Sequence, residues 1–294
     1  MADVRFFWVD VFAERALTGN PLALVPDADG LDEDLMRTIT KEFNQSETTF
    51  LVAPGLPGAD HRLRSFTVGG VEVLGAGHNA MGAWIWLAEA GLLPLEGGSF
   101  AQQIGDDVLP VRVTRTDDGR SRVTMRQGRP RFLAKVDGHD ALADALGLDA
   151  VELAAERPAE VVTTGAEHML VAVRTRDAVD RAVPDTARLR SLLAAHGAEG
   201  CYVYSTEADE GSSDAYTRFF NPTVGIVEDP ATGTAAGPLA ALLVRDGIVA
   251  DGASVRILQG RAMGRPSVLE VVVDGEQVEL SGSGLVVAEG VLHL

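Results

Sequence analysis

The sequence predicts an α/β protein of two domains, each built from strands and one long helix. Its 294 residues exceed the size at which a single hydrophobic core usually stops growing. Both halves also follow the same order, in which strands precede a helix that begins at a glycine-rich turn and a hairpin follows. We therefore expect a structural duplication around a shared cleft, although no clear residue-level repeat accompanies it.

The composition is that of an ordinary globular protein. Hydrophobic residues make up 46% and charged residues 23% of the chain, so it can bury a substantial core. The formal net charge is −18, and no run of Lys or Arg offsets it locally. A field of this sign repels nucleic acid and anionic lipid. We expect no nucleic-acid partner, no membrane partner and no membrane span, and, because a signal-peptide pattern is lacking, a cytoplasmic location.

Periodicity gives the elements of the first half. Apolar residues four apart predict a helix over 32–43, and a second helix is expected over 83–90, after the glycine-rich turn at 75–82. The strands expected from β-branched and apolar runs are 4–12, 22–25, 48–52, 63–68, 71–74, 108–113 and 121–125. Gly128-Arg129-Pro130 then interrupts the pattern. We place the domain boundary there, which gives domains 1–127 and 128–294.

The second half is read in the same way. Helices are expected over 141–148 and 187–196, and a third over the alanine- and leucine-rich run 238–244. The acidic segment 207–211 reads as an exposed turn. The expected strands are 161–164, 170–173, 200–205, 219–227, 255–258, 268–273, 278–281 and 285–292.

One polar stretch, 228–237 with the sequence EDPATGTAAG, separates a strand from the helix that follows. Pro230 fixes its own φ, and the small residues leave the amides of the first helical turn uncovered. Such a turn can bind a carboxylate or phosphate, with Asp229 and Thr234 adding an acceptor and a hydroxyl. The plainer interpretation is a capped helix start, in which Thr232 or Thr234 is the N-cap and Asp229 forms the turn.

Other motifs are weak or lacking. Gly75-x-Gly77-x-x-Ala80 has the form of a dinucleotide fingerprint, but the first half holds too many hairpins for a parallel sheet. No two histidines have metal-ligand spacing, and no serine stands in a G-x-S-x-G elbow. The single cysteine, Cys201, lies in an apolar run. We expect it to be a buried structural thiol and expect no metal site.

Four residues remain that amphipathic patterning does not explain: Glu47, His78, Asp229 and Thr234. Each lies beside a glycine or at the end of a strand. Glu47 lies at a loop-to-strand junction, where a side chain can project past a sheet edge into a cleft. Taken singly, each could be a cap or a solvated side chain.

Six segments occur in a specific order and spacing: Asp10-Val11-Phe12, TGNPLA at 18–23, EFNQSETTF at 42–50, Gly77-His78, EDPATGTA at 228–235 and MGRPS at 263–267. With these segments, nearly the whole chain resembles the PhzF-like family of phenazine-biosynthesis isomerases, which shares one fold with diaminopimelate epimerases and proline racemases. The resemblance implies an α/β (α+β) protein of two similar domains, each a mixed, curled sheet around a central helix. It implies an active site between the domains and a last strand, about 285–294, that can return to the first domain. It also implies a homodimer without metal or organic cofactor.

The resemblance carries roles to individual positions. It implies that Glu47 transfers the proton and that His78 and Asp229 assist it and bind the substrate. The substrate-binding positions that it implies are Asn20, Ser46, Gly77, Asn79, Gly233 and Thr234. Thr234 stands where serine is frequent in the family, and its added methyl group narrows the pocket. In the family, the segment that precedes the Gly-His pair usually contains proline and phenylalanine, whereas residues 69–76 contain neither.

The implied reaction moves a carbon-bound proton along a small carboxylate-bearing cyclic substrate, with trans-2,3-dihydro-3-hydroxyanthranilate as the family's reference. One carboxyl group can take and return the proton, and burial would raise the pKa of Glu47 toward neutrality. The two glycine-rich helix starts could bind the substrate carboxylate. A two-thiol racemase is excluded, because Cys201 is the sole cysteine. An epimerase, dehydratase or cyclase of another pathway, or a non-catalytic binding protein, stays open.

Overall fold

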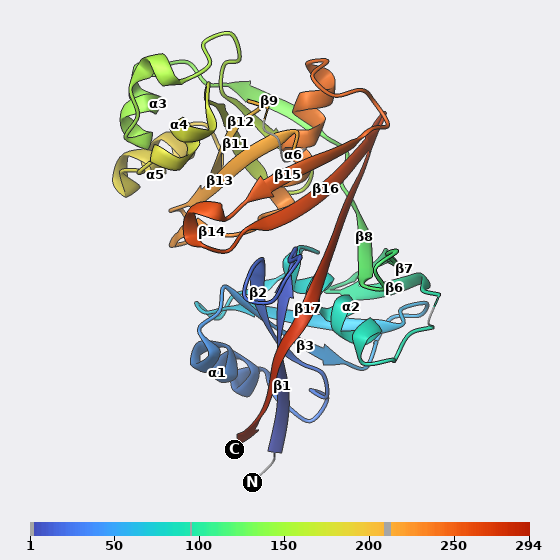
Figure 1. The fold of residues 1–294 in the computed structure, drawn as a ribbon. Helices are drawn as coiled ribbons and strands as arrows, with labels where there is room; N and C mark the ends of the chain where they lie inside the picture. Colours follow the sequence, from blue (N-terminus) through green and yellow to red (C-terminus); the bar gives the residue numbers. More distant parts are fainter. Residues whose placement is uncertain (1–2, 95, 209–212) are drawn as a thin grey trace. The chain divides into compact units, whose positions relative to one another are not determined.

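The computed structural model describes residues 3–94, 96–208 and 213–294. The chain divides into two compact units (Figure 1): unit 1 is Met1–Arg126 with Ser281–Leu294, and unit 2 is Gln127–Leu280. The expected boundary follows residue 127, and the observed one follows residue 126. Of the acidic turn expected at 207–211, residues 209–211 lie outside the described part of the chain.

Unit 1 is a mixed sheet with one buried helix and one surface helix. The helices are α1 (Glu33–Phe43) and α2 (His78–Glu89). The strands are β1 (Asp3–Val11), β2 (Asn20–Val25), β3 (Glu47–Val52), β4 (His61–Thr67), β5 (Glu72–Val73), β6 (Gly98–Ile104), β7 (Asp107–Arg115), β8 (Ser121–Gln127) and most of β17 (Gln277–His293). Helix α2 is buried from His78 to Ala88 and packs against β1, β2, β3 and β4. It forms the centre of the unit.

Unit 2 repeats this plan with more helices on its surface. Its helices are α3 (His139–Leu146), α4 (Arg176–Arg181), α5 (Thr186–Ala195) and α6 (Gly233–Arg245), with 3-10 turns at Ala150–Glu152 and Arg261–Met263. Its strands are β9 (Arg131–Lys135), β10 (Glu160–Thr163), β11 (Glu167–Ala172), β12 (Gly200–Ser205), β13 (Ala215–Asn221), β14 (Ile226–Asp229), β15 (Ser254–Gln259) and β16 (Ser267–Asp274). Helix α6 is the buried central helix and packs against β10, β11 and β16.

The strand pairing reveals the duplication directly. In unit 1 the pairing alternates along the chain: antiparallel β1–β2, parallel β2–β3, antiparallel β3–β4, parallel β4–β6 and antiparallel β6–β7. In unit 2 the pairs β10–β11, β11–β12, β12–β13, β13–β15 and β15–β16 follow the same order. Each unit also inserts a short antiparallel strand, β5 or β14, just before its central helix. The expected duplication is therefore present in the topology.

Several expected boundaries were wrong. Helix α2 begins at His78 rather than at residue 83, and it includes Gly82, where a Cβ atom would lie 2.6 Å from a methyl carbon of Leu22. Gly82 was expected to precede the helix. It instead lies within the helix, where the close approach of β2 leaves no room for a side chain. Strand β9 follows directly where a linker was expected, and β5 holds two residues of the four expected. The segments 278–281 and 285–292 form one strand, β17.

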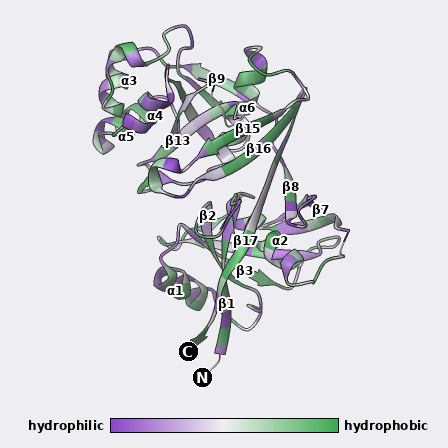
Figure 2. Cartoon of the chain, in the orientation of Figure 1, coloured by the Kyte–Doolittle hydropathy of each residue, from purple (hydrophilic) through white to green (hydrophobic). Residues whose placement is uncertain are grey.

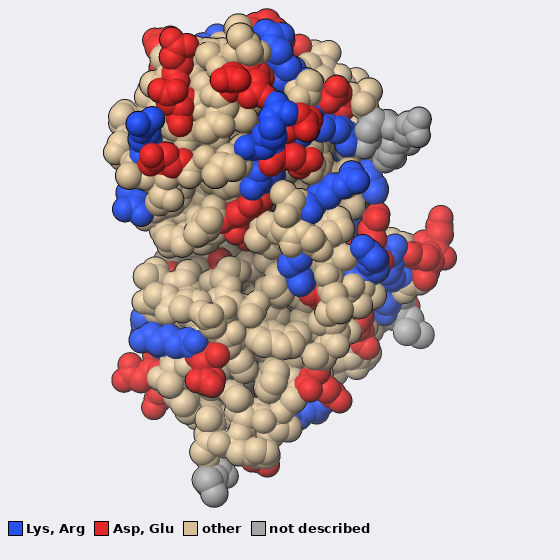
Figure 3. Space-filling view, turned by 60° about the vertical axis from the view of Figure 1, so that its left-hand side comes forward, with Lys and Arg blue, Asp and Glu red and all other residues tan. Residues whose placement is uncertain are grey.

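Exposed elements carry more hydrophilic residues than buried ones. Helix α1 buries Met36 and Ile39 and carries much hydrophilic purple in Figure 2, whereas β15 and β16 carry much green. On the face shown in Figure 3, basic side chains lie next to acidic ones. Ion pairs among the described residues include Arg64 with Glu33 and Arg218 with Glu228. Within the described residues, no helix is long and apolar enough to cross a membrane.

Candidate active site

In unit 1, the structure brings Ser46, Glu47 and His78 together. Glu47 is the first residue of β3, at the predicted loop-to-strand junction, and His78 is the first residue of α2. The His78 imidazole lies between the other two side chains: its Nδ1 is 3.7 Å from Glu47 Oε2, and its Nε2 is 3.4 Å from Ser46 Oγ. A carboxyl group, an imidazole and a hydroxyl therefore share one small region.

The Glu47 carboxyl group is desolvated. Its side chain is 20% exposed as a whole, yet Oε2 is buried and has no hydrogen-bond partner among the described residues. Burial favours the neutral acid and raises the pKa of Glu47 to about 7. The group is therefore present in both protonation states near neutral pH, which is what a group that takes and returns a proton requires.

Asn79 holds the turn that presents His78. Its Oδ1 accepts a hydrogen bond from the Gly77 amide at 2.7 Å, and its Nδ2 donates to Ser65 Oγ and to the Gly75 carbonyl, both at 3.1 Å. Ser65 Oγ also lies 2.9 Å from Thr49 Oγ1. With Asn79 only 1% exposed, its amide serves the loop, and this geometry favours a positioning role over the predicted contact with substrate.

Asn20 is the first residue of β2, paired with Val11 of β1, and it is buried. Strand β2 runs parallel to β3, with Ala23 beside Thr48. Parallel strands begin at the same edge of a sheet, so Asn20 lies at the edge of the sheet where Glu47 lies.

In unit 2, a buried hydrogen-bond network fixes Asp229. Thr232 Oγ1 donates to Asp229 Oδ2 at 2.5 Å, and Gln259 Nε2 donates to the Asp229 carbonyl at 2.7 Å. Gln259 Oε1 in turn accepts from the Thr232 amide at 3.1 Å and from Tyr202 Oη at 2.8 Å. Thr217 Oγ1 donates to Tyr202 Oη at 3.0 Å. This chain of contacts holds the Asp229 carboxyl group in one place.

The two central helices begin without a side-chain cap. Thr232 occupies the N-cap position of α6, but its hydroxyl donates to Asp229 instead of accepting from the helix, and Gly77 at the start of α2 has no side chain to offer. Neither first turn contains an acidic residue. By contrast, Asp32 caps α1 in the ordinary way. Helix N-termini with neither a side-chain cap nor a first-turn carboxylate suit a bound anion.

Gly233 and Thr234 form the first turn of α6, and neighbouring side chains fix both. Gln127 Nε2 donates to the Gly233 carbonyl at 2.8 Å. His168 Nε2 lies 3.1 Å from Thr234 Oγ1. Sequence reasoning assigned no role to His168, because it lies in an apolar strand, 66 positions from Thr234. Only the packing of β11 against the central helix brings the two together.

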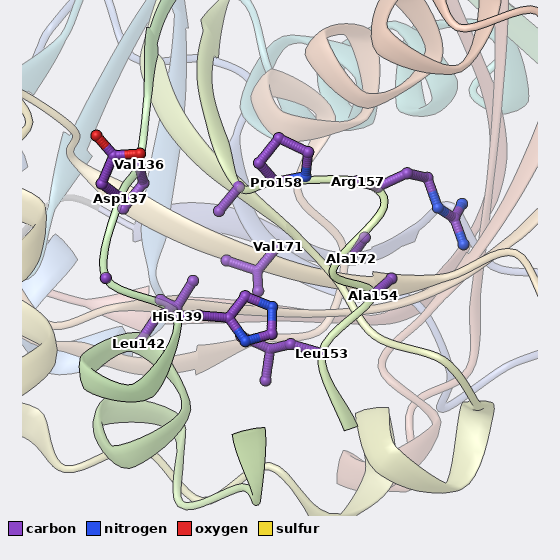
Figure 4. Close-up of a pocket in the computed structure, with 12 residues that line it drawn as sticks. Val136, Asp137, His139, Leu142, Leu153, Ala154, Arg157, Pro158, Val171 and Ala172 are labelled. Carbon is purple, nitrogen blue, oxygen red and sulfur yellow. The ribbon is translucent and has the colours of Figure 1, made fainter. Parts of the chain in front are cut away.

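Neither the cysteine nor a cavity found in unit 2 belongs to these groups. Cys201 is buried, as predicted, and burial raises its pKa to about 12. A cavity of about 170 Å³ in unit 2 includes Asp137, His139 and Arg157 in its lining (Figure 4), but none of the predicted site residues. In the described part of the chain, no group of three His, Cys, Asp or Glu residues could hold a metal ion.

A family model described as phenazine biosynthesis-like protein matches residues 9–290. A trans-2,3-dihydro-3-hydroxyanthranilate isomerase of Pseudomonas fluorescens is 34% identical over 297 residues, which cover 97% of this chain and 98% of that protein.

Solved structures agree with the fold. A PhzF-family phenazine biosynthesis protein of Bacillus anthracis matches with a TM-score of 0.91 and 27% identity over 100% of both chains. A hydroxyproline epimerase of Agrobacterium vitis, with bound trans-4-hydroxy-L-proline, matches with a TM-score of 0.63 and 13% identity, covering 99% of this chain and 91% of that one. The predicted epimerase-like fold is thereby confirmed.

Proposed function

Because the chain belongs to the phenazine biosynthesis-like protein family and is an isomerase, we propose that Glu47 moves a carbon-bound proton within a small, carboxylate-bearing cyclic substrate. The observation that carries this proposal is the buried Glu47 carboxyl group, whose pKa burial raises to about 7. A carboxylate with a normal pKa would be a weak base, and its conjugate acid would be scarce at neutral pH.

The proposed reaction needs a single proton carrier. The Glu47 carboxylate accepts the proton from a substrate carbon, and the electron pair of that C–H bond enters the conjugated system of the substrate. The resulting carboxylic acid then returns the proton to a second carbon, so no atom or electron is gained or lost. His78, whose Nδ1 is 3.7 Å from Glu47 Oε2, is placed to steady the changing charge on the carboxyl group.

Carboxylate binding is assigned to the helix starts. The first turns of α2 and α6 carry backbone amides that no side chain caps, and Thr234 adds a hydroxyl. Amides of this kind bind a carboxylate without a buried Arg or Lys. Asp229, held by Thr232 and Gln259, supplies a fixed acceptor for an N–H or O–H group of the substrate.

The first substrate to try is trans-2,3-dihydro-3-hydroxyanthranilate, for which the Pseudomonas fluorescens relative is named. The decisive variant is Glu47→Gln, which keeps the shape of the side chain and removes only its ability to carry a proton. We expect turnover to fall by roughly 10²–10⁴-fold while substrate binding stays within a few-fold. Glu42→Gln, an exposed neighbour on α1, is the matched control and should leave turnover unchanged.

Deuterium from the solvent distinguishes the competing reactions. To the extent that the Glu47 acid exchanges its proton with D₂O before returning it, an isomerisation should place deuterium on the carbon that receives the proton, whereas an epimerase would place it on the original carbon with inverted configuration. A loss of less than about tenfold in Glu47→Gln would remove Glu47 from the proposed role. Tight binding without any turnover would favour the non-catalytic binding protein instead.

Cofactor independence and the homodimer are further parts of the proposal. Activity should survive extensive dialysis against a chelator. Light scattering of the purified protein should give about twice the mass of the 31.0 kDa chain.

A further inference from the structure

We propose that His168 is a positioning residue that donates a hydrogen bond to Thr234 and so turns the Thr234 hydroxyl into a donor toward an acceptor oxygen of the substrate. This inference rests on the proposed function, because it names the partner of a proposed substrate-binding residue. It concerns only residues of unit 2.

The His168 ring is fixed by its surroundings. It stands on β11, is 2% exposed, and meets the Phe219 ring edge to face, with ring centroids 5.1 Å apart. Glycine at position 200 makes room for this pair, since a Cβ there would lie 2.4 Å from Phe219 and 3.3 Å from His168 Nδ1. The ring therefore has little freedom to turn away from Thr234, whose Oγ1 lies 3.1 Å from Nε2.

The second ring nitrogen indicates where the proton resides. His168 Nδ1 is buried and has no hydrogen-bond partner among the described residues. If Nε2 accepted a hydrogen bond from Thr234, a neutral ring would carry its proton on Nδ1, and a buried N–H would be left without an acceptor. Orphaned buried N–H groups are rarer than under-satisfied acceptors. Burial also lowers the pKa of His168 to about 4, so the ring is neutral at pH 7. The proton is thus placed on Nε2, facing Thr234.

The consequence for Thr234 follows from the chemistry of a hydroxyl group. A hydroxyl has one proton and two lone pairs. The His168 N–H occupies one lone pair, and no other hydrogen bond of this hydroxyl is found in the described part of the chain. Its proton is then directed to an acceptor. Because the backbone amides at the start of α6 are donors as well, the Thr234 hydroxyl adds a donor on the side of the helix N-terminus, which fits a carboxylate oxygen.

The direct test is nitrogen NMR of the ¹⁵N-histidine-labelled wild-type protein at pH 7, with His168→Gln used to assign the signals. We expect His168 to be the neutral Nε2–H tautomer. A neutral Nδ1–H tautomer or an imidazolium would overturn the proposal. This measurement needs no substrate, so it stands even if the proposed isomerase reaction fails.

Variants test whether His168 acts through Thr234. His168→Leu should raise KM for trans-2,3-dihydro-3-hydroxyanthranilate by roughly tenfold or more with a smaller effect on kcat, because a charge-assisted hydrogen bond is weakened. His168→Gln, whose amide can still donate, should stay within about threefold of wild type. His196→Gln, at the C-cap position that follows α5, is the control histidine variant and should change neither constant.

A double-mutant cycle completes the test. Thr234→Val should raise KM as His168→Leu does, and adding His168→Leu to Thr234→Val should have little further effect. Equal effects of His168→Leu in the two backgrounds would show that His168 does not act through Thr234. Failure of the wild-type protein to convert or bind the trial substrate would contradict the proposed function, whereas the NMR result would still decide the direction of the hydrogen bond.

Discussion

Burying the Glu47 carboxyl group opposes folding in a pH-dependent way. Its pKa is about 7 in the folded protein against a model value of 4.5. Between these two pH values the folded protein keeps a proton that the unfolded chain loses. Stability contributed by the neutral group is therefore complete below pH 4.5 and is lost as pH rises toward 7.

This linkage predicts that Glu47→Gln is stabilising at alkaline pH. Relative to wild type, its free energy of unfolding should gain about 2 to 3 kcal/mol between about pH 5 and about pH 8, since one pKa unit is worth about 1.36 kcal/mol. Urea denaturation at the two pH values measures the difference. The exposed Glu42→Gln should show no such gain, and a pH-independent difference for Glu47→Gln would contradict burial as the cause of the raised pKa.

Individual site residues were predictable only where a local motif marks them. Glu47, His78 and Asp229 stand in segments whose composition sets them apart, and the structure places each at the end of a strand or the start of a helix. His168 and Gln259 carry no such mark. Their roles depend on contacts between separate elements, with partners 66 and 30 residues away in the sequence, and one sequence alone does not reveal such contacts.

At the level of the elements, glycines determine how closely neighbouring helices and strands pack. This role made the start of helix α2 hard to predict from the sequence. Glycine ordinarily marks the end of a helix, so α2 was expected to begin after Gly82. The structure instead uses this glycine inside the helix, because β1 and β2 approach it too closely for any side chain. The element types were predictable from periodicity, whereas the boundaries depended on tertiary contacts.

Strand β17 shows the same dependence and yields a stability prediction. At Gly284 a Cβ would lie 2.3 Å from the Asp10 carbonyl and 2.9 Å from Ile85 of α2. Gly284→Ala should therefore destabilise the protein by about 1 to 3 kcal/mol, as overpacking does elsewhere. Thermal unfolding would measure it. Gly30→Ala, which meets nothing within 4 Å, is the control, and equal melting temperatures for the two variants would contradict this packing.

For the whole molecule, the net charge of −18 opposes the arrival of an anionic substrate. If backbone amides rather than a basic patch bind the carboxylate, screening should help capture. We expect kcat/KM to rise modestly, by roughly two- to threefold, between about 0.02 M and about 0.2 M salt. Uncharged osmolyte at matched viscosity serves as the control. A steep fall with salt would reveal a basic recruiting surface and contradict this mode of binding.

The two-unit plan was predictable because each half repeats one order of elements, and that order survives without a repeated sequence. What repeats is the strand pairing, because both units have the same series of parallel and antiparallel pairs. The course of the last strand was not evident from periodicity, since alternation gives a strand but not its partner. Only the resemblance to a known fold suggested its return.

The return of β17 has a consequence for synthesis on the ribosome. The strand pairs with β1 from Asp3 opposite His293 to Val11 opposite Gly284, so β1 emerges long before this partner strand is made. Unit 2, which is continuous in sequence, can complete its core while the edge of β1 is still unpaired. Nascent chains stalled before residue 281 should therefore recruit chaperones to unit 1, and release of the final segment should end that engagement.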